Sequence, residues 1–281
     1  MCKLRCALAA AGALCWVLAD GNAAWSEPRA GALLDSHVVR GGRNIAETWL
    51  AEPTTRYQHY VLGTRHEAAS LVAVLRDGRI LTLRLPKTSV FEDRKPRLAD
   101  LNGDGKDEIV VVRSYLDRGA ALAVVAVRGA ELKIIAETPP IGIPHRWLNP
   151  AGIADFDGDG RLDIAYVQMP HVMGRLRVWT LEPQGLREIA SLDDTSNHML
   201  GSRQLGLAAV ADFDGDGVSD LAIPSLDRRS LRFLTFKGGA RELGRKPLPS
   251  PAVADFSLES QDGRSVVVVG LEGGKKIKVR F

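Results

Sequence analysis

The chain has 281 residues, of which 45% are hydrophobic and 25% are charged, and its formal net charge is +3, which is ordinary for a soluble globular protein. No nucleic-acid fold signature, Ser/His/Asp motif or phosphate-binding glycine loop appears, so we expect no nucleic-acid partner and identify no catalytic residue. The three cysteines, Cys2, Cys6 and Cys15, all lie near the start, which excludes disulfides, zinc–thiolate sites and cysteine nucleophiles from the rest of the chain.

The first 24 residues have the organisation of a secretory signal peptide. Lys3 and Arg5 form a basic start, an apolar run follows over Cys6–Ala19, and cleavage is expected after the small residue Ala23 or Ala24. We therefore expect an exported protein, periplasmic or extracellular. The run is short for a bilayer span and no later run approaches one, so no transmembrane span is expected, with an uncleaved anchor as the alternative.

The next segment, Trp25–Thr55, matches none of the repeats that follow and holds one strand or short helix, Asn44–Ala51. After it, Val61–Val74 aligns without gaps on the acidic loops described below. Its first and last ligand positions are occupied by Leu62 and Ser70, so we expect this degenerate copy to be metal-free.

Three near copies of one acidic, glycine-rich loop follow, in Ala99–Val112, Ala154–Val167 and Ala211–Pro224. Counted from the first Asp, carboxylates or an amide stand at positions 1, 3, 5 and 9, and position 7 is assigned to the same sites. Hard oxygen donors at this density suit Ca²⁺, which takes about 6–8 of them, so we predict three calcium sites. The predicted metal-site residues are Asp100, Asn102, Asp104, Lys106, Glu108, Asp155, Asp157, Asp159, Arg161, Asp163, Asp212, Asp214, Asp216, Val218 and Asp220.

Glycines at positions 4 and 6 of each loop permit the positive φ angles of a tight turn. Without a cation, clustered carboxylates would repel one another. An EF-hand begins in the same way but needs Glu at position 12, which here is Val111, Tyr166 or Ile223 within an apolar strand. The remaining alternative is a solvated acidic turn without metal, which three copies with the same spacing disfavour.

Short apolar runs around these loops predict strands, and Asp77–Gly78 is a hairpin signal between two of them. The predicted strands are Leu71–Leu75, Ile80–Leu85, Ile109–Ser114, Ala121–Val127, Leu132–Thr138, Leu162–Gln168, Arg175–Leu181, Leu186–Ser191, Leu221–Ile223, Leu231–Phe236, Arg241–Arg245, Ser265–Val269 and Lys276–Phe281.

The loops resemble the FG-GAP or VCBS-type repeats of the integrin α-chain β-propeller, in which D-x-[DN]-x-D-G-x-x-[DE] is a calcium loop between the first two strands of a blade. The resemblance implies an all-β fold. We expect a β-propeller of five blades, each with four antiparallel strands, over residues 56–281, with repeats starting near 57, 97, 149, 206 and 250. The last repeat lacks a fourth strand, and Asn44–Ala51 is expected to supply it and close the ring. An open array and six blades are the alternatives.

Alternate loops of antiparallel strands lie at opposite ends, so all three acidic loops are expected on one face. The integrin resemblance implies that the other face binds the ligand. Its arginines form forks that bind carboxylate, sulfate or phosphate, so an anionic glycan or protein partner is expected. If histidines take part, affinity should rise as pH falls through about 6.5. The candidate ligand-binding residues are His145, Arg146, Trp147, His171, His198, Arg203, Arg228 and Arg229.

For the three histidines, we favour exposed loop residues without shared geometry over a metal or catalytic trio. The expected function is that of an exported, monomeric, calcium-binding β-propeller that acts as a binding module. The alternative is a polysaccharide lyase or hydrolase that uses the face opposite the calcium sites. Against this alternative, no carboxylate pair stands out in the sequence away from the metal loops.

Overall fold

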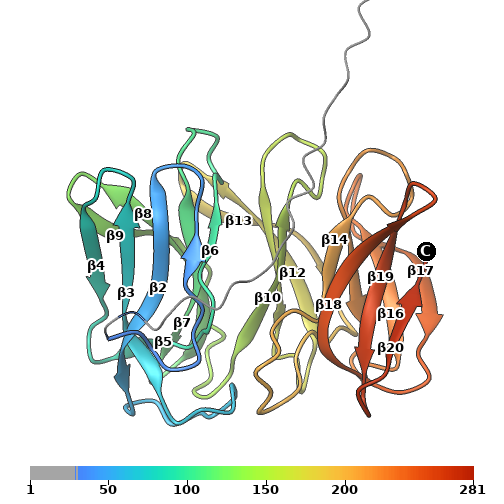
Figure 1. Cartoon of the computed structure of the whole chain (residues 1–281), viewed down its shortest axis with the longest axis horizontal. Helices are drawn as coiled ribbons and strands as arrows, with labels where there is room; N and C mark the ends of the chain where they lie inside the picture. The colour runs from blue at the N-terminus through green and yellow to red at the C-terminus, as the bar shows by residue number, and fades with distance from the viewer. Residues whose placement is uncertain (1–28, 30) are drawn as a thin grey trace, which may run out of the picture.

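The computed structural model describes residue 29 and residues 31–281, and within them it contains 20 β-strands and no helix. The strands pair antiparallel into four sheets that follow one another along the chain (Figure 1). The expected all-β class is therefore confirmed. The predicted signal peptide, residues 1–24, lies outside the described residues.

The largest sheet has nine strands and combines two consecutive units. The first unit pairs in the order β1-β2-β3-β4, and the second is built on β7 and β8. One residue pair, Ala68 with Phe91, joins the units through β3 and β5. The strands are β1 (Val39–Arg40), β2 (Ile45–Thr54), β3 (Glu67–Leu75), β4 (Ile80–Arg84), β5 (Ser89–Phe91), β6 (Arg97–Ala99), β7 (Glu108–Tyr115), β8 (Gly119–Arg128) and β9 (Glu131–Glu137).

The other three sheets each hold one unit, with four, four and three strands. In the last unit, β18 turns directly into β19 at Asp262 and Gly263, without an acidic loop between them. The strands are β10 (Leu148–Ala154), β11 (Asp163–Gln168), β12 (Arg175–Glu182), β13 (Gly185–Leu192), β14 (Ala209–Ala211), β15 (Asp220–Pro224), β16 (Ser230–Thr235), β17 (Arg241–Pro247), β18 (Ala252–Gln261), β19 (Arg264–Leu271) and β20 (Lys276–Val279).

The hydrophobic core lies between neighbouring units because both faces of the inner units are apolar. Along β7, Ile109 and Val111 pack in one cluster with the first unit, whereas Val110 and Val112 pack in another with the third unit. This is the alternation that a strand imposes on successive side chains. Each inner unit is thus held on both faces.

The last unit packs differently, since no hydrophobic cluster among the described residues joins β18–β20 to the first unit. The outward face of the first unit carries Trp49 and Val72. Ala32 and Val38, from the segment before β2, cover these two side chains. The segment before β2 therefore takes the place that a neighbouring sheet would have.

The expected closure of the ring by Asn44–Ala51 is wrong. These residues fall almost entirely in β2, which pairs with β3 and β1 in the first sheet and contributes no strand to β18–β20. The physical reason is that β3 pairs along one edge of β2, and β1 and Ala32 pair along the other, which leaves no edge of β2 for the last sheet. The count of five blades is not confirmed, because the Ala68–Phe91 pair merges two of the five units into one sheet.

The alignment of Val61–Val74 on the acidic loops is also wrong. The connection between β2 and β3 lies at the opposite end of the molecule, where the amide of Gly201 donates to the Val61 carbonyl at 2.9 Å. The turn that corresponds to an acidic loop in the first unit is the short β1–β2 connection. Its Asn44 side chain accepts a hydrogen bond from the Asp107 amide at 2.7 Å, next to the first acidic loop.

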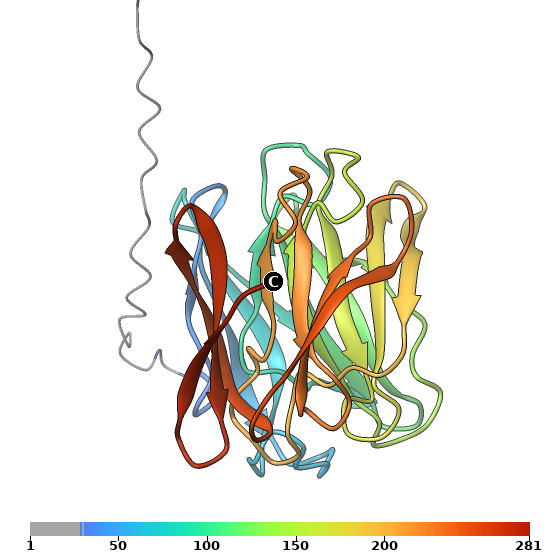
Figure 2. The same ribbon diagram turned by 90° about the vertical axis from the view of Figure 1, so that its right-hand side faces the viewer.

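The strands of all sheets run between the same two ends of the molecule (Figure 2). We call one end the acidic end, which holds the loops 100–107, 155–162 and 212–219. There, Gly158 lies so close to Val218 that a Cβ atom on it would come 3.0 Å from the valine Cγ2. We call the other end the histidine end, which holds the loops with Tyr57, His145, His171 and His198.

Candidate metal loops and the histidine end

Glycine allows the acidic loops to turn tightly around their first aspartate. In the second loop, Gly158 and Gly160 have φ angles of 82° and 86°, in the left-handed region that glycine adopts without strain. Their amides donate to the two carboxylate oxygens of Asp155, at 2.8 Å and 2.9 Å. The loop therefore fixes the orientation of its first carboxylate through backbone hydrogen bonds.

Two of the three loops bring three carboxylates together. In the second loop, Asp155, Asp157 and Asp159 each offer one oxygen, and these oxygens lie within 4.8 Å of one another. The third loop repeats this arrangement, with the same limit, in the group Asp212, Asp214 and Asp216. In the first loop, Asn102 takes the place of the second carboxylate.

The ninth residue of the second and third loops is a fully buried aspartate. One oxygen of Asp163 accepts a hydrogen bond from the Phe156 amide at 3.1 Å, and one oxygen of Asp220 accepts from the Phe213 amide at 2.9 Å. The other oxygen of each aspartate is buried and makes no hydrogen bond of ordinary geometry. Burial raises the pKa of Asp163 to about 6 and also raises the pKa of Asp220, although the Thr180 and Thr235 hydroxyls lie close enough to offset part of the rise for Asp163 and for Asp220 respectively. A bound cation would be the missing partner, so these residues fit a metal.

The first loop fits a cation less well. Both oxygens of its ninth residue, Glu108, accept hydrogen bonds at 3.0 Å, from the Leu101 amide and from the Asn102 side chain. Only Asp100 retains a buried oxygen without a partner. The Arg43 guanidinium also lies 3.9 Å from Asp100. We therefore expect the first loop to bind a cation more weakly than the other two.

The backbone amide of the residue at position 7 donates a hydrogen bond to the carboxylate at position 5 of the same loop. The amides of Lys106, Arg161 and Val218 donate at 2.9 Å to Asp104, Asp159 and Asp216 respectively. Two of these aspartates also have a cationic neighbour. Arg161 lies 2.7 Å from Asp159, and the Lys237 ammonium lies 3.1 Å from Asp216.

At the histidine end, two of the predicted ligand-binding residues are buried. The Trp147 indole is 2% exposed and donates a hydrogen bond to the Glu92 carbonyl at 2.9 Å. His198 is fully buried, and its ring packs against Trp147 at 4.8 Å between centroids. The expectation that these two side chains contact a ligand is therefore wrong, because they are part of the packing between loops.

His171 and His198 share geometry, contrary to the expectation of three unrelated loop histidines. Nε2 of His171 lies 2.8 Å from Nδ1 of His198, and Nε2 of His198 lies 3.1 Å from the Ser202 carbonyl. Burial lowers the pKa of His171 to about 4 and that of His198 to about 3. These two rings are neutral near pH 6.5, so they supply no charge for an anion there.

The remaining predicted residues at this end keep accessible side chains. His145 packs beside Tyr57 and His59, at 5.0 Å and 5.4 Å between ring centroids. The Arg203 guanidinium lies 3.2 Å from Asp35, and the buried Nε of Arg228 has no hydrogen-bond partner. The exposed residues are His145, Arg146, Arg203 and Arg229, and the partly exposed ones are His171 and Arg228.

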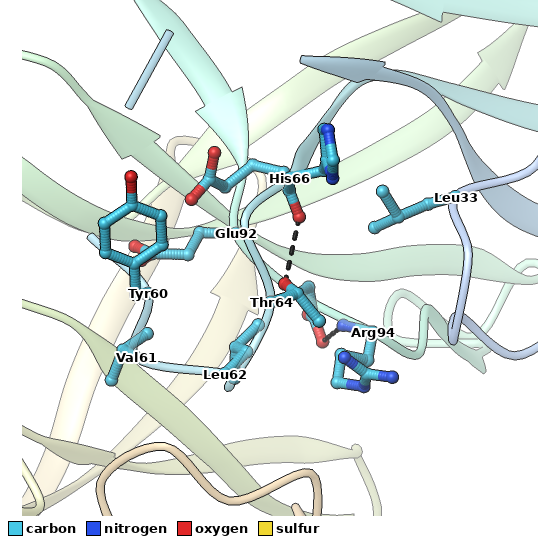
Figure 3. A pocket seen from close by; sticks show the side chains of 10 residues that line it. Leu33, Tyr60, Val61, Leu62, Thr64, His66, Glu92 and Arg94 are labelled. Atoms are coloured by element: carbon cyan, nitrogen blue, oxygen red, sulfur yellow. Dashed lines mark hydrogen bonds between the residues drawn. The ribbon is translucent and has the colours of Figure 1, made fainter. Parts of the chain in front are cut away.

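Two buried glutamates, Glu67 and Glu92, were missed in the sequence. Figure 3 shows Glu92 among the residues that line their shared cavity. Both glutamates line this cavity of about 10 Å³, together with Arg94. Nδ1 of His59 lies 2.7 Å from Glu92, whereas Oε2 of Glu67 has no hydrogen-bond partner. Burial, and then the neighbouring charge of Glu92, raise the pKa of Glu67 to about 7. The signal that was available is the charged run 92–94, which interrupts apolar strand residues.

The family comparison matches the region that holds the acidic loops. The model of the FG-GAP-like repeat matches residues 100–166 and, in a second copy, residues 155–223. Residues 100–223 of the chain are therefore FG-GAP-like repeats. No curated protein sequence matches it.

Two solved structures resemble the chain at low identity. One is the exotype rhamnogalacturonan lyase YesX, with 14% identity and a TM-score of 0.44, over 88% of this chain and 58% of the lyase. The other, from Bacteroides fragilis NCTC 9343, is provisionally assigned as a 6-phosphogluconolactonase, with 13% identity and a TM-score of 0.42, over 86% of this chain and 68% of that one. The chain thus spans less than two thirds of the lyase.

The FG-GAP repeats form a succession of antiparallel units whose acidic loops connect the first two strands of each matched unit. Within the part of the chain that the structure describes, no helix is both long and apolar enough to cross a bilayer.

Proposed function

We propose that this protein binds Ca²⁺ in its acidic loops and acts, as an exported monomer, as a binding module for an anionic glycan or protein. The observation that carries the calcium proposal is the pair of buried aspartate oxygens, on Asp163 and Asp220, that make no hydrogen bond of ordinary geometry. Buried carboxylates are costly unless they are paired. The bound ion would supply the positive charge that these carboxylates lack. The residues that coordinate it would fix the conformation of the loop that joins the first two strands of each unit.

The residues that would hold calcium come from the loop itself. Asp155, Asp157 and Asp159 offer converging oxygens in the second loop, and the third loop offers an equivalent set. Extracellular calcium modules bind with Kd values near ~10⁻⁴–10⁻³ M. At ten times Kd, each occupied site would add about 1.4 kcal/mol to the free energy of unfolding.

The calcium proposal is tested by calorimetric titration and thermal unfolding of Asp157→Ala and Asp214→Ala variants. Each variant should lose one binding event and melt at a lower temperature than the parent in calcium, but not in chelator. Asp117→Ala is the matched control, because Asp117 is 71% exposed and lies outside the loops. Equal melting losses in chelator and in calcium would contradict the proposal.

Export is proposed from the basic start and apolar run of the first 24 residues. N-terminal sequencing of protein recovered from outside the cytoplasm should begin at Ala24 or Trp25. Retention of Met1 on that protein would contradict cleavage.

A lyase or hydrolase remains the second candidate, since Glu67 and Glu92 form a carboxylate pair away from the metal loops. A carboxyl with a pKa of about 7 is suited to act as a general acid. However, the cavity of about 10 Å³ is the size of a single water molecule. A turnover assay on uronic-acid polymers tests this candidate, and activity that Glu67→Gln abolishes would favour it over the binding module.

A further inference from the structure

A second cavity, at the acidic end, is large enough for a small ligand. It has a volume of about 320 Å³ and lies between the first and second acidic loops. Asn102 and Arg161 border it from those loops, and Arg128 borders it from the end of β8. Small-molecule sites in proteins span about 300–1,000 Å³, so this cavity lies at the small end of that range.

The cavity has an apolar floor, and its rim carries two guanidinium groups and one carboxylate, that of Glu182, which is paired with Arg187 at 2.6 Å. Leu181 is buried in the hydrophobic cluster between the second and third units, and Ile135 packs against the same cluster. Two guanidinium groups, those of Arg128 and Arg161, border the opening. An apolar surface beside a few polar groups is the usual construction of a site for a small ring-shaped ligand.

Arg128 has no carboxylate partner within the described residues. Its Nη1 makes only a 3.4 Å contact with the carbonyl of its own neighbour, Val127. Its position at the rim of a cavity, which the Arg161 guanidinium also borders, distinguishes it from other exposed arginines. An unpaired guanidinium at the rim of a cavity points to an anionic group in the ligand.

We propose that this cavity binds a uronic acid unit of an acidic glycan, with its carboxylate on Arg128 and Arg161 and its ring on the apolar floor. A single aspartate or glutamate side chain of a protein partner would fill only part of the volume. The glycan class is therefore favoured over an acidic protein. This inference rests on the proposed function and moves its ligand site from the histidine end to the acidic end.

Calcium should be required for this binding. Asp157 and Asp159 lie in the loop that borders the cavity, and their charges repel an anion when no cation is present. Asp159 also holds the Arg161 guanidinium through two hydrogen bonds, at 3.0 Å and 2.7 Å. Because Asp159 is a proposed calcium ligand, metal binding competes with this ion pair and leaves Arg161 more available to the ligand.

The test is binding of glucuronate and galacturonate to the full chain, measured by saturation-transfer NMR and calorimetry in calcium and in chelator. Glucose is the neutral control, and polyglutamate represents an acidic protein. Arg128→Ala should weaken uronate binding about tenfold or more, since hydrogen bonds to charged groups are worth about 1.5–3 kcal/mol. The matched control, Lys133→Ala on β9, should bind like the parent. Arg229→Ala, at a candidate ligand-binding residue of the histidine end, decides between the two ends of the molecule.

Calcium affinity of the Arg128→Ala variant is measured separately and should equal that of the parent. A parent that binds calcium but no uronate overturns the cavity proposal while the calcium proposal stands. Uronate binding that Arg128→Ala leaves unchanged, or that Arg229→Ala removes, also overturns it. Polyglutamate binding of equal strength that depends on Arg128 would overturn the glycan class. Uronate binding that depends on Arg128 but persists in chelator would support the cavity as the site and overturn its requirement for calcium.

Discussion

The side chains of His171 and His198 form a hydrogen-bonded pair, with 2.8 Å between Nε2 of the first and Nδ1 of the second. The pair stacks beside the Trp147 indole, which lies nearly parallel to the His171 ring at 6.3 Å between centroids. A shared hydrogen bond requires one ring to donate and the other to accept, which two protonated imidazoles cannot do. The geometry therefore favours the neutral state of at least one ring.

The first prediction follows from this pair. Because burial holds the folded pKa values of His171 and His198 at about 4 and 3, neither imidazole should titrate near pH 6.5 in the native protein. The unfolded chain binds these protons first, so the free energy of unfolding should fall as pH drops below about 6.5. NMR titration of the two imidazoles, assigned with His171→Asn, measures this. A native midpoint near 6.5 for both rings would contradict it.

The second prediction concerns Glu67. Its folded pKa of about 7 lies above the usual value of a glutamate, so the folded state holds the proton more tightly than the unfolded state. Below about pH 4.5 this tighter proton binding adds up to about 3 kcal/mol to the free energy of unfolding. This contribution is lost as pH rises through about 7. Glu67→Gln cannot ionise and should become more stable relative to the parent between pH 5 and pH 8.

Urea unfolding of the parent and of Glu67→Gln at these two pH values measures the difference. Glu131→Gln is the matched control, because the Glu131 side chain is 67% exposed. A stability difference between parent and Glu67→Gln that does not change with pH would show that the folded state does not hold this carboxyl protonated.

The third prediction concerns the hairpin beside the histidine end. Gly119 has a φ angle of 74°, and a Cβ atom on it would come 2.3 Å from the Ile143 carbonyl oxygen. Gly129 has a similar φ of 64° but open space around it. Gly129→Ala should therefore lower the free energy of unfolding only by the strain of a left-handed alanine, about 1–2 kcal/mol. Gly119→Ala should lower it by about 3 kcal/mol or more, because its Cβ atom would also clash. Denaturant unfolding compares the two, and equal losses would argue against the close approach.

The fourth prediction concerns the cation beside the first acidic loop. The Arg43 guanidinium lies 2.8 Å from Asp107 and 3.9 Å from Asp100, where it opposes a bound Ca²⁺. Arg43→Ala should raise the calcium affinity of this loop roughly two- to tenfold at low salt, and less at high salt. Calorimetry in a background with Asp157→Ala and Asp214→Ala isolates the first loop.

Arg40→Ala is the control for Arg43→Ala, since Arg40 pairs with Glu47 instead. An unchanged or weaker calcium affinity in Arg43→Ala would mean that Arg43 supports the loop more than it opposes the ion.

Local chemistry made some of this structure predictable. The glycines at positions 4 and 6 of the loops adopt the positive φ angles that their spacing predicts. The Asp77–Gly78 signal lies in the turn between β3 and β4. Both features depend only on residues that are close in the sequence.

Features that depend on distant residues were not predictable in the same way. The Ala68–Phe91 bridge and the packing of His198 against Trp147 are contacts between segments far apart in the sequence. Local residue patterns do not predict which loops contact one another. The orientation of the first unit was also missed, because its β1 strand has two residues and its turn lacks the acidic spacing. Short strands give little periodic signal.

The missing partner of the last sheet implies a gradient of local stability along the chain. Within the described residues, the strands β18–β20 share apolar contacts only with the fourth unit, whereas each inner unit packs against a neighbour on both of its faces. Hydrogen exchange should therefore run fastest through β20 and slowest through β7 and β8, and partial opening should begin at the last sheet before the whole molecule unfolds.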